Sequence, residues 1–373
     1  MTIFQKSQTT AYAKLQAAKG SAETVAAANA VDLLLESPMV QPRGEQIDRG
    51  LIRGSRFPSK QVDGGRWGEG SVNLEIRGSG SAGVAPEFGP LLETLLGTEQ
   101  VVSADTVEAG SGTASGFDAS EQWPVGTVVR VDVNGDGSVY DVRKIDSVTG
   151  TGPYTASVRR AFSSTPADGA DITAGVTYFH AGTESEQYFT FEQYLDGLKL
   201  LCTDTVCENL QFSTNARQVI QGTFGLRALT RAQSAATDSL TPTFDDTAPL
   251  IGTECNLVLA GSALDMQGFE FNLSSRRARG GINSAGYADL PWMSKFEATG
   301  TLTPWVEDEQ PITDYFAGTL ADIEMVKGDT AGNILAVILE DVQYTGQDIG
   351  EEDGDFSWNL PFVITGGVYI ALF

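Results

Sequence analysis

Residues 49–98 decide the fold, and they read RGLIRGSRFPSKQVDGGRWGEGSVNLEIRGSGSAGVAPEFGPLLETLLGT. The stretch holds short segments in which polar and apolar residues alternate, many glycines, and then one compact apolar segment. The stretch contains no catalytic motif. Such a segment is typical of a protein that packs its surface against copies of itself.

Two strands and one helix are predicted in this stretch. The strands cover residues 51–56 and 72–77, and in the second Val72, Leu74 and Ile76 alternate with polar side chains, as in a half-buried strand. The helix covers residues 86–97, where four leucines between positions 91 and 96 form one apolar stripe. Gly97 stands where a left-handed C-terminal cap belongs.

The rest of the chain carries strand and turn signals. Val129, Val131 and Val133 alternate with polar residues, and residues 334–339 form a continuous apolar run typical of a central strand. Long helical periodicity is absent. The sequence therefore predicts a mainly β fold, a sandwich or barrel with one short helix.

Three parts are predicted along the chain. Residues 1–30 form an N-terminal arm, residues 31–97 and 183–373 form the β-sandwich core, and residues 98–182 form an inserted small β domain. The amino-acid composition changes in the insertion, where Gly, Ser, Thr and Asp separate the short predicted strands.

Composition excludes several classes of protein. Hydrophobic residues make up 41% of the 373 positions and charged residues 20%, so a packed core is expected and wholesale disorder is not. The net charge of −25 argues against general affinity for nucleic acid, because neutralising phosphates needs clustered Lys and Arg. The simplest interpretation of this negative charge is that it keeps the protein soluble and has no further role.

The cysteines and the N-terminus indicate the compartment. Cys202, Cys207 and Cys255 are an odd number, so a complete disulfide framework within one chain is not possible and a reducing site of folding is favoured. The first twenty residues lack the apolar core of a signal peptide, and no segment reaches membrane-spanning length. Synthesis in the cytoplasm and no membrane partner are expected.

One loop resembles a metal-binding motif. Residues 132–138, DVNGDGS, match the opening of an EF-hand calcium loop, but that loop needs a bidentate Glu at its twelfth position, where this chain has Arg143. No helices are predicted on either side. A tight β-hairpin turn is the preferred interpretation.

Catalytic motifs give no assignment. His180 is the single histidine, so a Ser-His-Asp triad or Cys-His pair would depend on it, and no GxSxG elbow is present. One histidine and three cysteines make a poor zinc set, and phosphate-binding glycine motifs are absent. A glycosidase carboxylate pair stays open, because the sequence cannot select two acids among 49. No catalytic, cofactor or metal residue is assigned.

One basic cluster and one acidic run are candidates for contacts between subunits. The cluster RRARGG follows a strand, and its alternative interpretation is a solvated hairpin loop. The hypothesis is that it meets an acidic surface of a neighbouring copy. The candidate interface residues are Arg276, Arg277, Arg279, Glu351, Glu352 and Asp353.

Several blocks, taken together and in order, resemble the tail tube proteins of long-tailed (siphovirus-type) bacteriophages. These blocks are GLIRGS, SVNLEIRGS, EFGPLLETLLG, FDASEQWPVGTVVRV, FTFEQYLDGLKLLCTDTVCENLQFSTNARQVIQGTFGLRA and NLPFVITGGVYIALF. The resemblance implies a β-sandwich whose sheets join those of neighbours in a six-membered ring, and rings that stack into a tube. It also implies a virion location, tape measure, tail terminator and distal tail proteins as partners, and double-stranded DNA passing through without specific binding.

Two alternatives stay open. An all-β carbohydrate-binding or tail-tip adhesion module would use tryptophans to stack on sugars, although the five are spread over separate segments and form no visible platform. They are Trp67, Trp123, Trp292, Trp305 and Trp358. A capsid decoration or tail terminator protein would share the β class and differ chiefly in stoichiometry.

Overall fold

The computed structural model describes residues 9–34, 40–47, 62–182, 186–253, 255–277, 293–306, 309–352 and 355–373. Within these residues the protein is mainly β, with two α-helices and one short 3₁₀ helix (Ala27–Asn29), so the predicted fold class is confirmed. The strand predicted over residues 51–56 lies outside the described residues.

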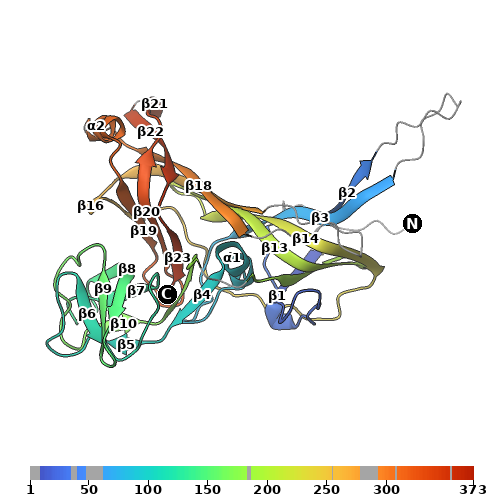
Figure 1. Ribbon diagram of the computed structural model, residues 1–373, viewed down its shortest axis with the longest axis horizontal. Helices are drawn as coiled ribbons and strands as arrows, with labels where there is room; N and C mark the ends of the chain where they lie inside the picture. The colour runs from blue at the N-terminus through green and yellow to red at the C-terminus, as the bar shows by residue number, and fades with distance from the viewer. Residues whose placement is uncertain are drawn as a thin grey trace, which may run out of the picture.

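Seventeen of the described strands form one continuous antiparallel sheet (Figure 1). They are β1 (Thr9–Leu15), β2 (Gln41–Ile47), β3 (Val62–Glu75), β4 (Thr98–Val102), β11 (Gly175–Phe179), β12 (Phe189–Leu195), β13 (Leu198–Asn215), β14 (Gln221–Ala235), β15 (Asn256–Leu259), β16 (Ser262–Ala263), β17 (Met266–Arg277), β18 (Met293–Pro304), β19 (Ala321–Lys327), β20 (Leu335–Tyr344), β21 (Asp348–Glu352), β22 (Asp355–Ile364) and β23 (Val368–Leu372).

The long hairpin of β13 and β14 is the point where this sheet divides. The first half of β13 pairs with β12, and its second half pairs with β17, with a bulge between Cys207 and Asn209. Because one strand changes its neighbour along its length, the sheet forms two branches that enclose a shared core. Predicted strand residues Val72, Leu74 and Ile76 are all buried in that core.

The predicted helix is confirmed as α1 (Gly89–Leu96), which lies against β13. Its four leucines are at most 1% exposed, since the apolar stripe faces the core. Gly97 adopts the left-handed conformation (φ +97°), and its N–H donates to the carbonyl of Glu93 at 2.7 Å. This geometry ends the helix as expected of a glycine cap.

Six further strands form a second, smaller sheet in the order β5-β10-β7-β8-β9-β6. They are β5 (Asp105–Thr106), β6 (Gly116–Ala119), β7 (Val128–Asp132), β8 (Tyr140–Thr149), β9 (Tyr154–Val158) and β10 (Asp171–Thr173). Val129, Val131 and Val133 are buried in a cluster that belongs to this sheet, as their alternation predicts. The chain enters and leaves through β4 and β11, which pair with each other in the large sheet. The proposed domain boundaries remain a prediction.

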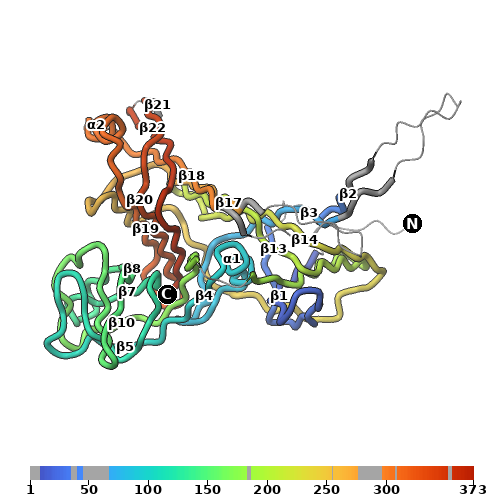
Figure 2. Tube along the Cα trace, in the orientation of Figure 1, coloured from blue at the N-terminus to red at the C-terminus, as the bar shows by residue number. Residues whose placement is uncertain are grey.

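A second helix, α2 (Gln310–Ala317), was not predicted from the sequence. None of its residues is fully buried, but Ile312 and Tyr315 are half-buried and pack against the core of the large sheet. In Figure 1, α2 lies beside β21 and β22 at one end of the molecule, while the β2–β3 hairpin extends at the other end. Figure 2 shows the same separation along the chain trace.

Candidate assembly surfaces

The α2 end of the molecule exposes large apolar side chains. Phe316 of α2 is 78% exposed, Phe356 of β22 61%, Ile349 of β21 59% and Leu320 52%. The pairing of Ile349 with Trp358 and of Glu351 with Phe356 places Ile349 and Phe356 on one face of the β21–β22 hairpin. We call Phe316, Leu320, Ile349 and Phe356 the apolar end. Their elements lie at one end of the molecule (Figure 1), and large exposed apolar side chains mark candidate interaction sites on protein surfaces.

A cavity of about 430 Å³ lies beside the apolar end. Trp305, Tyr344 and Trp358 line it, so the structure brings together two tryptophans that the sequence left on separate segments. The hydroxyl of Tyr344 and the indole N–H of Trp358 are buried and have no hydrogen-bond partner in the described part of the chain. Burial, together with the nearby charge of Asp314, raises the pKa of Tyr344 above its usual value.

The sheet has unpaired edges at both ends of the molecule. Among the described strands, β2 pairs only with β3, and β21 pairs only with β22. An edge strand offers free N–H and C=O groups to another chain. Pro42 in β2 fits an edge position, because proline cannot donate to a ladder.

The predicted interface residues that the structure describes do not lie together within one chain. Arg276 and Arg277 end β17, and Arg277 pairs with Met293 at the start of β18. At the opposite end of the β17–β18 hairpin, Trp305 follows β18 and forms a β-bridge with Ser357 of β22. The acidic residues lie on that β22 side. Glu351 is exposed on β21, and Glu352 ends the strand. Arg279 and Asp353 lie outside the described residues. Whether these groups meet across two copies remains a prediction.

The small sheet contacts the large sheet through paired charges, which we call the ion-paired interface. Lys144 Nζ of β8 lies 2.7 Å from Glu340 Oε1 of β20, and Arg143 Nη1 lies 3.5 Å from Glu324 Oε2 of β19. Arg159 Nε lies 3.1 Å from Asp322 Oδ2. Val128 and Val142 pack beside these pairs against apolar residues of β20. The structure therefore satisfies the charges of this face within one chain.

Burial shifts the titration of this interface. It raises the pKa of Glu324 to about 7, even though Arg160 and Arg143 oppose the change. It also lowers the pKa of Arg143, whose neighbour Arg160 acts in the same direction. These groups are separated by long stretches of sequence, and no local pattern could have paired them.

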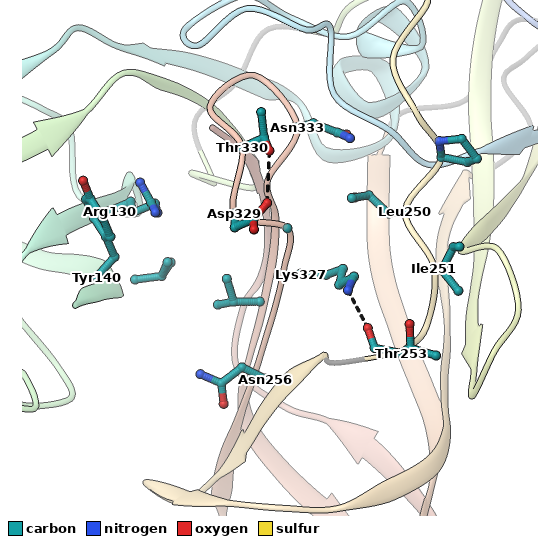
Figure 3. A pocket seen from close by; sticks show the side chains of 14 residues that line it. Arg130, Tyr140, Leu250, Ile251, Thr253, Asn256, Lys327, Asp329, Thr330 and Asn333 are labelled. Atoms are coloured by element: carbon teal, nitrogen blue, oxygen red, sulfur yellow. Dashed lines mark hydrogen bonds between the residues drawn. The ribbon is translucent and has the colours of Figure 1, made fainter. Parts of the chain in front are cut away.

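A cleft of about 480 Å³ separates β7 and β8 from the turn between β19 and β20 (Figure 3). Arg130 holds its guanidinium 3.5 Å from the ring centroid of Tyr140. Across the cleft, Lys327 Nζ donates to the carbonyl of Thr253 at 2.5 Å, and the Thr330 hydroxyl donates to Asp329. These polar groups contact partners within the chain.

The residues considered for catalysis lie apart. His180 is exposed after β11, with its ring 4.5 Å from that of Phe296, whereas Cys202 and Cys207 are buried in β13. Burial raises the pKa of the Cys202 thiol to about 12. Among the described residues, no three His, Cys, Asp or Glu side chains form a group that could hold a metal ion. The described part of the chain thus presents exposed apolar side chains and open sheet edges that suit assembly.

A sequence model of the phage tail tube protein family matches residues 8–363, which is nearly the whole chain. The chain belongs to this family. No curated protein matches it significantly. Membership gives the protein a structural role in the tail tube of the virion, and self-assembly and association with other tail proteins follow from that role. In the described part of the chain, no helix is long and apolar enough to cross a membrane.

Proposed function

We propose that copies of this protein form stacked rings of six subunits, which together make the hollow conduit for the phage genome. The observation that carries this proposal is the apolar end, where Phe316 alone is 78% exposed. In a ring, the apolar end of one subunit would be covered by its neighbour. The contact is between different surfaces, so it can repeat around a ring and along a tube.

The sheet edges supply a second kind of contact in this proposal. Strands β2 and β21 lie at opposite ends of the molecule and can pair with strands of neighbouring copies (Figure 1). Joining edges between subunits removes free backbone groups and closes the inner strands into a continuous wall. The basic residues Arg276, Arg277 and Arg279 would meet the acidic run of residues 351–353 in such a contact.

The charge suits a conduit for DNA. A net charge of −25 repels the phosphate backbone, so double-stranded DNA would pass without specific binding. The protein would act without catalysis or cofactor. It would be made in the host cytoplasm and would meet the tape measure, tail terminator and distal tail proteins during tail assembly.

Electron microscopy of the purified chain tests this function. The sample is concentrated stepwise, stained and searched for rings and tubes, with Phe316→Ser as a matched variant. The proposal predicts sixfold rings or hollow filaments for the wild type and their loss in the variant. Closed oligomers of another symmetry would contradict the six-membered ring, and assembly unaffected by Phe316→Ser would contradict the role of the apolar end.

The cavity beside α2 favours a second candidate, a carbohydrate-binding or adhesion role. Trp305 and Trp358 line the cavity together, and aromatic rings stack on the apolar faces of sugars. A sugar that binds the native protein would raise its melting temperature by mass action. Melting curves with a panel of mono- and disaccharides test this candidate, and Trp305→Ala should abolish any shift.

A further inference from the structure

The turn between β7 and β8 gathers oxygen atoms in one short loop. Its sequence places side-chain oxygens at Asp132, Asn134 and Asp136 and a main-chain carbonyl at Ser138. These are positions one, three, five and seven of a calcium loop, and glycine stands at position six as that loop requires. Gly137 adopts φ +76°, which favours glycine. The loop needs no flanking helices to present these oxygens.

Asp132 carries a buried oxygen that no group in the described part of the chain satisfies. The residue is only 2% exposed. Its Oδ2 accepts a hydrogen bond from the N–H of Gly137 at 2.6 Å, which turns the carboxylate toward the loop. Its Oδ1 is buried without a hydrogen-bond partner in the described part of the chain. A buried carboxylate oxygen without a partner is costly, and a cation is the partner that would satisfy it.

The remaining oxygens of the loop are available to the same ligand. Asp136 is exposed, and its Oδ1 accepts hydrogen bonds from the N–H of Ser138 at 3.0 Å and from the Ser138 hydroxyl, so the loop orders this side chain without covering it. The Oδ1 of Asn134 accepts from the Ser164 hydroxyl at 3.3 Å, a long contact that leaves a second lone pair free. The set therefore offers two carboxylates, an amide oxygen and a carbonyl.

We propose that this loop binds Ca²⁺ through Asp132, Asn134, Asp136 and the main-chain carbonyl of Ser138. Hard oxygen ligands and a flexible loop suit Ca²⁺ better than Mg²⁺, which demands a near-ideal octahedron. Water completes the coordination, because position twelve is Arg143, which pairs with Asp141 at 3.0 Å. The bound ion holds the β7–β8 turn of the small sheet.

The affinity is weak for two physical reasons. The loop lacks the bidentate Glu of a complete calcium loop, and the positive charge of Arg130 lies near Asp132. Sites with few charged ligands bind Ca²⁺ with dissociation constants of about 10⁻⁴ to 10⁻³ M. The loop therefore responds to millimolar Ca²⁺ and not to traces of it.

Calorimetric titration of the full chain with CaCl₂ tests this site, after the protein has been freed of metal by dialysis against EDTA. Ionic strength is held constant with NaCl, and an equal titration with MgCl₂ measures non-specific cation binding to the acidic surface. Asp136→Asn removes one ligand charge at an exposed position, where substitutions usually change stability little. Asp168→Asn is the matched control, because Asp168 lies in an exposed loop beside the small sheet and caps only the Gly110 N–H.

The expected result is one Ca²⁺ site per chain that is weakened by about tenfold or more in Asp136→Asn and unchanged in Asp168→Asn. The melting temperature should rise with added Ca²⁺ in the wild type and should rise less at each Ca²⁺ concentration in Asp136→Asn. Equal responses to Ca²⁺ and Mg²⁺, or equal binding by the two variants, would overturn the site. These outcomes are independent of whether the chain forms tubes.

Discussion

The ion-paired interface and the apolar end are two surfaces of opposite character. At the first, Arg143, Lys144 and Arg159 meet carboxylates of β19 and β20 from the same chain. At the second, Phe316 and Phe356 face solvent. Charges that already have partners hold a part of one subunit in place. Apolar side chains without a covering layer indicate a partner that lies outside the subunit.

The difference also concerns specificity. A buried ion pair gains little net stability, because desolvation offsets its attraction, but a missing partner is strongly penalised. The ion-paired interface therefore fixes how the small sheet sits on the large one. Apolar contact is less directional and roughly proportional to area, so the apolar end can supply the driving force of association.

The largest effect is expected from Arg143→Ala in the ion-paired interface. The Arg143 side chain is 5% exposed, and its removal takes the paired cation from Asp141 and leaves Glu324 with Arg160 alone. Breaking a buried pair on one side costs about 3 kcal/mol of unfolding free energy. Urea unfolding measures this loss. Arg159→Ala is the control, since its side chain is 40% exposed and should cost below about 1 kcal/mol. An equal loss of unfolding free energy in the two variants would contradict the claim that burial makes the Arg143 ion pairs costly to break.

The next effect concerns pH. Burial raises the pKa of Glu324 from 4.5 to about 7, so the native state binds a proton more tightly than the unfolded chain does. The stability that this group contributes is present below pH 4.5 and is lost as the pH rises through 7. The loss is about 3 kcal/mol. Unfolding curves between pH 5 and pH 8 should show a pH dependence that Glu324→Gln reduces, and an unchanged dependence would contradict the assignment.

A smaller effect on free energy is expected at the apolar end. Phe316→Ser should leave the unfolding free energy within about 0.5 kcal/mol of wild type, because the side chain is exposed. It should raise the concentration needed for assembly by about tenfold, since buried apolar contact between copies is lost. Sedimentation measures assembly. Phe244→Ser, at a phenylalanine that is 40% exposed elsewhere, should assemble as wild type does.

The smallest effect is expected from the basic cluster. Neutralising Arg276, Arg277 and Arg279 together should weaken assembly a few-fold, and more at low salt, where screening is least. Sedimentation at several salt concentrations measures the threshold. An unchanged threshold at every salt concentration would mean that these arginines are solvated in the assembly.

Much of the fold could be predicted because it follows local patterns. The leucine stripe predicted α1, and the alternating valines predicted β7. Helix α2 was missed because it is short and only Ile312 and Tyr315 pack on the core while Phe316 is exposed, although Pro311 near its start and Gly318 after its end were usable signals. The family resemblance rested on the order of many weak blocks, and the match over residues 8–363 confirms it.

The assembly surfaces could not be predicted in the same way. An apolar residue such as Phe356 reads as core in a sequence, and only the structure shows that it faces solvent. The partners Arg143 and Glu324 belong to distant strands, so their pairing depends on the tertiary fold. The candidate residues at 276–279 and 351–353, like the domain boundaries, remain predictions, because a single chain does not show its neighbours.

Hydrogen exchange of the free subunit and of the assembled protein tests the central claim most directly. The account predicts that assembly slows exchange in α2 and in β21 and β22, while β8 in the ion-paired interface exchanges equally in both states. If assembled protein shows no added protection at α2 and the β21–β22 hairpin, the apolar end is not the surface through which the subunits associate.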